Sequence, residues 1–188
     1  MKIAIHQPEH FPYLGFFEKM KSVDLFVILD DVQFVKGNWH NRNRFINKNG
    51  EWEYFGVQVE KDAYKKRICD VKIVDGNWRK KVVKKIQQNF SIDMQKYYEG
   101  NSLLSTNIES IKWGMDKLNI STPLVYSSEL NVDSKNTERI IDICKILKAD
   151  TYLSGLGAKD YLQEELFTEI ELEYFNKKIT NFESVIAL

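Results

Sequence analysis

The stretch that decides the fold is MKIAIHQPEHFPYLGFF, residues 1–17. Residues 1–5 form a short apolar run with one charge, which is long enough for a strand and too short for a helix. Pro8 and Pro12 then interrupt regular structure, because proline fixes its own φ and pushes the residue before it toward extended geometry. A polar turn therefore follows the end of a buried strand. In a parallel sheet with crossover helices ligands bind at this place, so we take the turn as the candidate site.

Four polar side chains occupy this turn: His6, Gln7, Glu9 and His10. An imidazole can accept a proton near neutral pH, so His6 and His10 are candidate catalytic bases. The alternative for each is a turn histidine that bonds only to backbone. A metal held by His6, His10 and Asp30 is a weaker alternative, because no sequence spacing requires these residues to converge.

The composition is typical of a globular domain. The 188 residues are 43% hydrophobic and 29% charged, so a sizeable core is expected. Lys plus Arg and Asp plus Glu are both 27, a balance that gives no overall attraction to DNA or to an anionic membrane. Cys69 and Cys144 are expected to be buried thiols of a reducing compartment. Because there is no signal-peptide pattern and no stretch as long as a membrane span, we expect a soluble, cytoplasmic protein without membrane insertion.

Strand and helix patterns alternate along the rest of the chain. An antiparallel hairpin is expected around residues 47–50 (NKNG), because Asn-Gly readily takes positive φ. Alternating units at both ends of the chain imply a mainly parallel sheet with right-handed crossovers. The patterns predict strands at residues 24–34, 71–74, 123–130, 149–153 and 170–174, and helices at residues 13–22, 78–89, 103–118, 134–147 (with Ser134 as its N-cap) and 159–166.

The expected fold class is α/β, a Rossmann-like three-layer sheet in one domain over residues 1–188. Residues 35–118 interrupt the alternation and are expected to form an insertion with the β-hairpin and a helical segment. This insertion is expected to cover the strand ends, which would place its basic loop on the same side as the N-terminal turn.

Asp30 and Asp31 close the second expected strand. Acidic side chains at such a place can bind a metal, a cofactor hydroxyl or the amine of a substrate, and they can equally start a turn by bonding to their own backbone. Both are candidate catalytic residues that orient the base or hold an amine, and at least one of them is expected to be structural.

The densest polar stretch is VKGNWHNRNR, residues 35–44. If it is extended, both arginines face one way and both asparagines the other, and two guanidinium groups on one face suit a phosphate or a carboxylate. The tryptophan can stack on a base or a sugar. The alternative is a solvated loop with charged tips. The candidate binding residues of this loop are Trp39, His40, Asn41, Arg42, Asn43 and Arg44.

A second polar turn, SGLGA at residues 154–158, follows the strand expected at residues 149–153. With a helix after it, this turn would present backbone N–H groups at a helix start, which suits an anion. SGLGA alone is a weak motif, because it is neither a P-loop nor the full dinucleotide fingerprint. Ser154 and Gly155 are candidate binding residues because they repeat the strand and polar turn of the N-terminus.

Four blocks together resemble the WbqC-like family over nearly the whole chain: AIHQPEHFPYLGFFEKM, DLFVILDDVQF, W-HNRNR and YLSGLGAKDYL. The family occurs mainly in bacterial gene clusters for surface polysaccharide such as O-antigen. The resemblance implies a transfer of glycine or another acyl group to an amino sugar. The positions that match the family are His6, Gln7, Pro8, Pro12, Gly15, Asp30, Asp31, Gln33, Asn41, Arg42, Asn43, Arg44, Ser154 and Gly155.

The sequence departs from the family pattern at its end, NKKITNFESVIAL. Family members usually continue into a block similar to S-I-x-D-L-L-F-N, which is absent here. If that block completes the site, the resemblance implies a chain that is inactive or dependent on a partner.

Three functions fit these features. The first is acyl or aminoacyl transfer to the amine of a nucleotide-linked sugar. His6 or His10 would act as base, and Arg42 and Arg44 would hold phosphate. Hydrogen bonds would come from Gln7 and from the Ser154–Gly155 amides. No cysteine or serine has a recognised nucleophile context, so we expect direct transfer, and the sequence requires no cofactor.

The second function is nucleotidyl transfer, because the strand, histidine-bearing turn and glycine-bearing helix resemble the layout of HIGH-type adenylyltransferases. Residues 14–17, LGFF, lack the histidine of that motif. The third function is a non-catalytic binding subunit of a polysaccharide assembly complex. All three imply a nucleotide sugar or nucleotide as partner, and an oligomer is compatible with the sequence.

Overall fold

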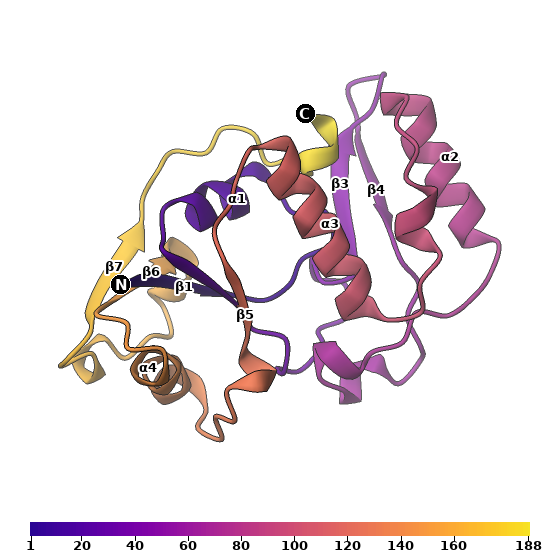
Figure 1. Cartoon of the computed structure of the whole chain (residues 1–188). Coiled ribbons are helices and arrows are strands. Elements are labelled where there is room, and N and C mark those ends of the chain that lie inside the picture. Colours follow the sequence, from indigo (N-terminus) through magenta and orange to yellow (C-terminus); the bar gives the residue numbers. More distant parts are fainter.

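A five-stranded parallel sheet forms the centre of the molecule, and the computed structural model describes all 188 residues (Figure 1). The strands in spatial order are β5 (Leu124–Tyr126), β2 (Leu25–Ile28), β1 (Lys2–His6), β6 (Thr151–Gly155) and β7 (Glu171–Phe175). The chain builds outward from β1 through β2 to β5, then returns to the other side of β1 for β6 and β7. The strand order therefore reverses between β1 and β6, which is the ligand-binding position of doubly wound folds.

Helices cover both faces of this sheet, and the Rossmann-like three-layer fold is confirmed. Helices α1 (Leu14–Lys21) and α3 (Leu103–Lys117) pack on one face, and α4 (Asn136–Ile146) packs on the other. Side chains of β1 alternate between these layers, as a strand requires: Ala4 joins the core under α1, whereas Ile3 joins the core under α4. No helix is both long enough and apolar enough to cross a membrane.

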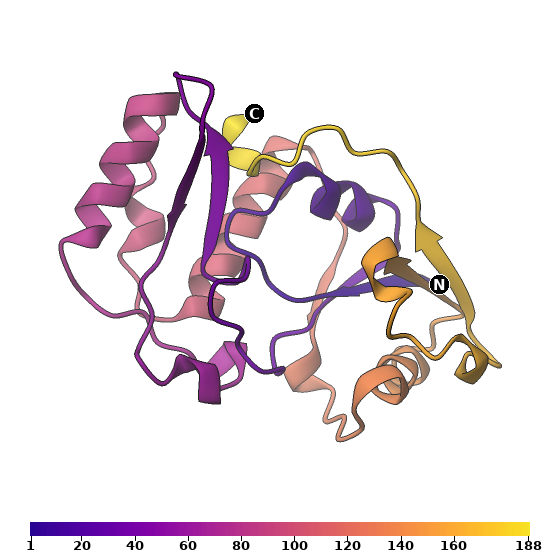
Figure 2. The same cartoon turned by 180° about the vertical axis from the view of Figure 1, so that it is seen from behind.

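The chain between β2 and β5 forms the predicted hairpin and helices. Strands β3 (Arg42–Ile46) and β4 (Trp52–Gly56) are antiparallel, and they lie between helix α2 (Trp78–Phe90) and the parallel sheet (Figure 2). The turn is as predicted: Gly50 has a φ of +82° and its N–H donates to the Asn47 carbonyl at 2.9 Å. Short 3₁₀ turns complete this part at Ala63–Lys65, Ile68–Asp70 and Gln95–Tyr98. That residues 35–118 act as an insertion over the strand ends stays a prediction.

Three local predictions are wrong, and two predicted strands are shorter than expected: the strand of residues 24–34 ends at Ile28 and that of residues 123–130 ends at Tyr126. Residues 159–166 form no α-helix, and the connection from β6 to β7 contains only 3₁₀ turns at Leu156–Ala158 and Glu164–Leu166. Leu162 is buried there while Tyr161 is 69% exposed, so the segment has no continuous apolar stripe to stabilise a helix. The turn at residues 154–158 therefore does not present the N–H groups of an α-helix start, on which the expected anion site depended.

The other two errors concern a cap and a strand. Ser134 does not cap α4, because its hydroxyl donates to Asp142 at 2.6 Å and Lys135 occupies the cap position. Residues 71–74 make only isolated bridges, from Lys72 to Ser102 and from Ile73 to Val59. Two further 3₁₀ turns lie at Ser127–Glu129, after β5, and at Val185–Ala187.

Candidate functional site

A cavity of 1050 Å³ opens at the carboxyl ends of β1 and β6, and we call it the switch-point cavity. His6 reaches it from β1 and Gly155 from β6, while Gly15 and Lys19 line it from α1. The position follows from the strand order, because the connections after β1 and β6 leave on opposite faces of the sheet and open a crevice between them.

The last part of the chain covers this cavity. After β7 it passes over α1, as Figure 1 shows, and Phe182 stacks on Tyr13 with ring centroids 6.0 Å apart. Backbone hydrogen bonds fix the segment, since Val185 N donates to the Pro12 carbonyl at 2.8 Å and Ser184 N donates to the Arg44 carbonyl at 2.9 Å. The segment therefore joins the N-terminal turn to the hairpin.

A second cavity of 720 Å³ lies on the α4 side of the same strand end, and we call it the α4-side cavity. The two cavities share Ile5, His6, Tyr152 and Tyr161 as lining residues. Gln7 lines the α4-side cavity, as do polar side chains of α4. His6 thus lines two hollows, each large enough for a small substrate, and its imidazole packs against Phe16 of α1 on the side of the switch-point cavity.

The hydrogen bonds of His6 define its free nitrogen. Its Nδ1 lies 3.0 Å from the Gln7 carbonyl, which can only accept, so Nδ1 carries the proton and Nε2 keeps its lone pair. Nε2 lies 4.0 Å from Glu9 Oε1. Burial and the Lys19 charge lower the pKa of His6 to about 3, so the ring is neutral at neutral pH.

Two charged residues of the N-terminal turn and α1, Glu9 and Lys19, have shifted pKa values beside His6. Burial raises the pKa of Glu9 to about 7, and its Oε2 is buried without a hydrogen-bond partner. Burial also lowers the pKa of Lys19 to about 8. Sequence reasoning placed Glu9 in the turn without a role and missed Lys19. The available signal was helical spacing, because Lys19 is three residues after the buried Phe16.

Gln7 is oriented by His40. The Val35 N–H donates to His40 Nδ1 at 3.3 Å, so the proton of this ring is on Nε2, which donates to Gln7 Oε1 at 2.7 Å. The amide oxygen of Gln7 is thereby occupied, and its NH₂ group remains available to a ligand. Both residues were predicted to bind substrate; the structure gives His40 a positioning contact.

His10 is completely buried and lines neither cavity. Its Nε2 lies 3.0 Å from the Tyr98 hydroxyl and its Nδ1 lies 3.3 Å from Asn107 Oδ1. Burial lowers its pKa to about 4. The His10 ring therefore connects the N-terminal turn to α3 and to the 3₁₀ turn at Gln95–Tyr98. We leave His10 out of the catalytic groups proposed below.

Asp30 and Asp31 bind protein groups. Asp30 accepts hydrogen bonds from the Ser128 N–H at 3.0 Å and the Ser128 hydroxyl at 2.8 Å. Asp31 accepts from the Ser127 hydroxyl at 2.6 Å and pairs with Arg139 at 2.5 Å. The two acids connect the ends of β2 and β5 and the start of α4. Neither aspartate lines the two cavities at His6. Asp31 contacts the α4-side cavity only through Arg139, which is one of its lining residues.

The arginines lie on one face of β3, as the alternation predicted, with Asn43 buried on the other. Arg44 stacks over the Trp52 ring at 4.1 Å and lies 5.6 Å from the Trp39 ring. Trp39 directly follows Asn38, which lines the switch-point cavity, whereas Trp39 and Arg44 are not lining residues of it.

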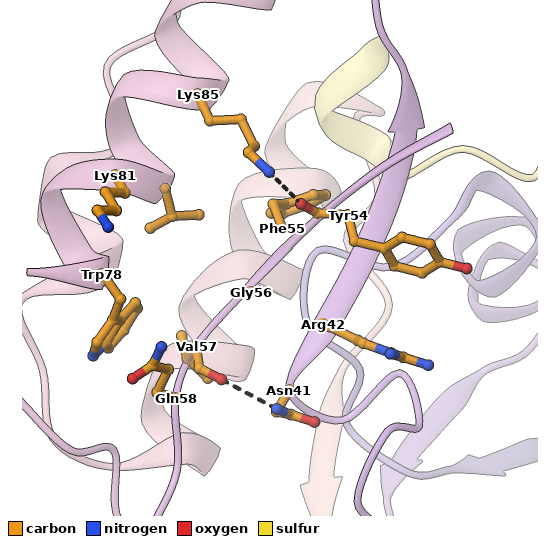
Figure 3. Close-up of a pocket in the computed structure, with 11 residues that line it drawn as sticks. Asn41, Arg42, Tyr54, Phe55, Gly56, Val57, Gln58, Trp78, Lys81 and Lys85 are labelled. Atoms are coloured by element: carbon orange, nitrogen blue, oxygen red, sulfur yellow. Dashed lines mark hydrogen bonds between the residues drawn. The ribbon is translucent and has the colours of Figure 1, made fainter. Parts of the chain in front are cut away.

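Arg42 and Asn41 line a different hollow, of 320 Å³, between the hairpin and α2 (Figure 3). The guanidinium of Arg42 points away from α2 and stacks on Tyr54, at 5.1 Å from its ring, so Arg42 borders the hollow without extending its charge into it. Asn41 Nδ2 donates to the Val57 carbonyl at 3.1 Å. This hollow is separate from the two cavities at His6, because it shares no lining residue with them.

Three further candidates hold the fold or lie apart. Asn43 Nδ2 donates to the carbonyls of His10 and Phe11, which supports the turn where Phe11 takes a φ of +44°. Gln33 Nε2 donates to the Tyr64 carbonyl at 2.7 Å on the surface. Ser154 is completely buried.

Comparison with known proteins assigns the chain to a family. The model of the WbqC-like protein family matches residues 7–185. This chain belongs to the WbqC-like protein family. It is 30% identical over 186 residues to an uncharacterized protein of Mycobacterium tuberculosis, and the alignment covers 91% of this chain and 79% of that protein. No solved structure matches the chain.

In this WbqC-like protein the predicted site residues separate by place. Those at the two cavities are His6, Gln7 and Gly155, with His40, Trp39 and Arg44 beside them. The others hold the fold or line other hollows. The separation identifies the region around His6 as the candidate site.

Proposed function

We propose that this WbqC-like protein transfers an acyl or aminoacyl group, such as glycyl, to the amine of a nucleotide-linked amino sugar. It would do so in the cytoplasm, as a transferase of surface polysaccharide (O-antigen-type) biosynthesis. The observation that carries the proposal is His6, a residue with a neutral imidazole that lines two cavities at the switch point of the sheet. Such a place suits a base that must meet two substrates.

In the proposed reaction the amine nitrogen attacks the acyl carbonyl carbon. A carbon–nitrogen bond forms, the bond from that carbon to the leaving group breaks with its electron pair, and His6 Nε2 takes the amine proton. An imidazole with a low pKa is a weak base by itself. Glu9, 4.0 Å away and partly ionised near neutral pH, would stabilise the imidazolium that forms.

The surrounding groups support direct transfer. The NH₂ group of Gln7, whose amide oxygen is held by His40, can donate to the developing oxyanion. Burial raises the pKa of the Cys144 thiol to about 12, so this thiol does not ionise near neutral pH and is unsuited to carry an acyl group.

The proposal is tested by turnover of the His6→Ala variant. Purified protein is incubated with nucleotide-linked amino sugars and a panel of acyl and aminoacyl thioesters and adenylates, and mass spectrometry detects the acylated sugar. We expect His6→Ala to abolish product while its circular dichroism matches that of the wild type. Lys112→Ala, on the exposed face of α3, is the control that should retain activity. Near-normal activity of His6→Ala on the true substrate would remove His6 from the mechanism.

Nucleotidyl transfer is the second candidate, and the strand order favours it. The reversal between β1 and β6, with a polar turn leading into α1, suits a nucleotide in the same crevice. Against it, Tyr13 and Phe16 flank Leu14 and Gly15 where a second histidine would be needed. Release of pyrophosphate from ATP or CTP would support this candidate. Binding that His6→Ala weakens, without any turnover, would instead support a non-catalytic sugar-binding subunit.

A further inference from the structure

We infer that Lys19 binds a phosphate or diphosphate group of a ligand in the switch-point cavity. The inference rests on the proposed function only for the view that this group belongs to a nucleotide-linked sugar. The anion site itself is argued from the surroundings of Lys19 and is independent of the transfer reaction.

Lys19 is a buried cation without a partner. The residue is only 5% exposed, and its side chain lines the switch-point cavity. Its Nζ forms no hydrogen bond or ion pair within the chain, and it lies 5.9 Å from the Phe26 ring centroid. Its Nζ is not closed off from solvent and opens on the cavity, where a largely buried cation is stabilised by an anionic partner. The free side of Lys19 is the cavity, so the compensating anion is expected to come from a ligand.

Glu9 does not supply this compensation. It is the one carboxylate whose charge acts on Lys19, but it makes no hydrogen bond to Nζ. Burial raises the pKa of Glu9 to about 7, so its carboxyl is partly protonated at neutral pH. Lys19 and Glu9 together therefore present a net positive charge to the switch-point cavity.

The cavity has room for a phosphate-bearing ligand. Its 1050 Å³ exceed the volume of a nucleoside diphosphate, and Gly155 and Gly157 leave part of the wall free, since an added Cβ at either glycine would meet no atom within 4 Å. Lys178 adds a second cation to the lining. The stacked rings of Tyr13 and Phe182 offer an aromatic edge for a base.

The arginines predicted for this role are less suited to it. Arg42 lines neither cavity at His6, and its guanidinium is stacked on the Tyr54 ring at 5.1 Å. Arg44 is stacked on two tryptophan rings, and its buried Nε has no partner, so only the outer part of its guanidinium could reach a ligand. Lys19, in contrast, acts directly on His6, because its positive charge contributes to the lowered pKa of that ring.

Calorimetric titration of the full chain tests the inference. The probes are inorganic pyrophosphate, uridine diphosphate and, as a carboxylate control, malonate. Lys19→Met removes the charge and keeps the length of the side chain, and Lys112→Met on α3 is the matched control. We expect pyrophosphate and uridine diphosphate to bind the wild type and Lys112→Met alike, and Lys19→Met to bind them at least about 10-fold more weakly, in line with the loss of one charge-assisted contact.

Thermal unfolding without ligand separates a binding role from a structural one. Because Lys19→Met replaces an unpaired buried charge by an apolar side chain, its melting temperature should equal or exceed that of the wild type. A lower melting temperature would indicate a structural lysine and overturn the inference. Unchanged affinity of Lys19→Met, no binding of either phosphate probe to the wild type, or tight binding of malonate alone would also overturn it. Since no acyl donor is present, phosphate binding that depends on Lys19 would stand even if transfer were never observed.

Discussion

His6 and His10 show how the backbone, rather than the residue type, decides the role of a side chain. Four residues apart in one turn, the first faces two cavities and the second is completely buried against Tyr98 and Asn107. The sequence marks both as candidates, because strand ends and prolines can be recognised from local pattern. The sequence does not show that Phe11 takes a positive φ and turns the chain. Nor does it show that the side chain of Asn107, 97 positions away, contacts the imidazole of His10.

A residue-scale prediction concerns Glu9. If Glu9 stabilises the imidazolium of His6, Glu9→Gln should lower kcat by about 10- to 100-fold, less than the ~10²–10⁴-fold contributed by a group that transfers the proton itself, with KM little changed. Because burial raises the pKa of Glu9 to about 7, the wild-type rate should rise with pH as Glu9 ionises across pH 6–8. The variant should lack this rise. A rate profile of Glu9→Gln parallel to that of the wild type would contradict the role.

At the scale of elements, periodicity predicted most of the chain. The β1 run, the NKNG hairpin and the amphipathic helices α2 and α3 form within one or two residues of their expected bounds. The α-helix expected at residues 159–166 does not form, because the charged and turn-forming residues there provide no long stripe of buried apolar side chains. The pairing of elements could not be predicted from periodicity, because it depends on contacts between distant residues such as those of Ser127.

An element-scale prediction concerns this serine, which joins β2 to β5. The buried Ser127 hydroxyl donates to Asp31 at 2.6 Å and accepts from the Asp30 N–H at 3.2 Å. Ser127→Ala would remove both hydrogen bonds, although the Asp30 N–H keeps the Ile28 carbonyl and Asp31 keeps Arg139, so the expected cost is about 1 kcal/mol of unfolding free energy. Urea denaturation measures it, with Ser128→Ala, at the more exposed neighbouring position, for comparison. Unchanged stability of Ser127→Ala would mean that the cluster at the strand ends does not hold β5 in place.

At the scale of the whole molecule, the buried His10 and His40 and the partly buried His6 make stability depend on pH. Burial lowers the pKa values of His6, His10 and His40 to about 3, 4 and 4, from 6.5. Below pH 6.5 the unfolded chain therefore binds protons that the folded chain does not, and stability falls as pH falls from 6.5 toward 4. Glu9 acts in the opposite direction between pH 7 and 4.5, because its folded pKa is raised from 4.5 to about 7.

The histidines outnumber Glu9, so the net effect is a loss of stability on acidification, with about two protons taken up on unfolding near pH 5.5. The melting temperature measured from pH 7 to pH 4.5 should decrease steadily. A melting temperature that stays constant or increases over this range would show that the three rings are not held neutral in the folded protein.

The α/β class could be anticipated from the alternating strand and helix patterns at both ends of the chain, and the candidate site from the first seventeen residues. The three-dimensional arrangement of the site could not, because its cover comes from the last segment of the chain and its buried cation from α1. The central claim is that ligands bind at the carboxyl ends of β1 and β6, beside His6.

The measurement that tests this claim most directly is thermal stabilisation by a uridine-diphosphate-linked amino sugar in three proteins. The first is the wild type. The second is Gly155→Leu, which fills the switch-point cavity from an extended backbone position where an added Cβ meets no atom within 4 Å. The third is Arg42→Ala on the hairpin, at a residue that lines neither cavity at His6. A ligand that binds only the folded state raises the melting temperature by mass action. The account predicts a rise for the wild type and Arg42→Ala and none for Gly155→Leu. An equal rise in Gly155→Leu, a rise lost in Arg42→Ala, or no rise in the wild type would contradict it.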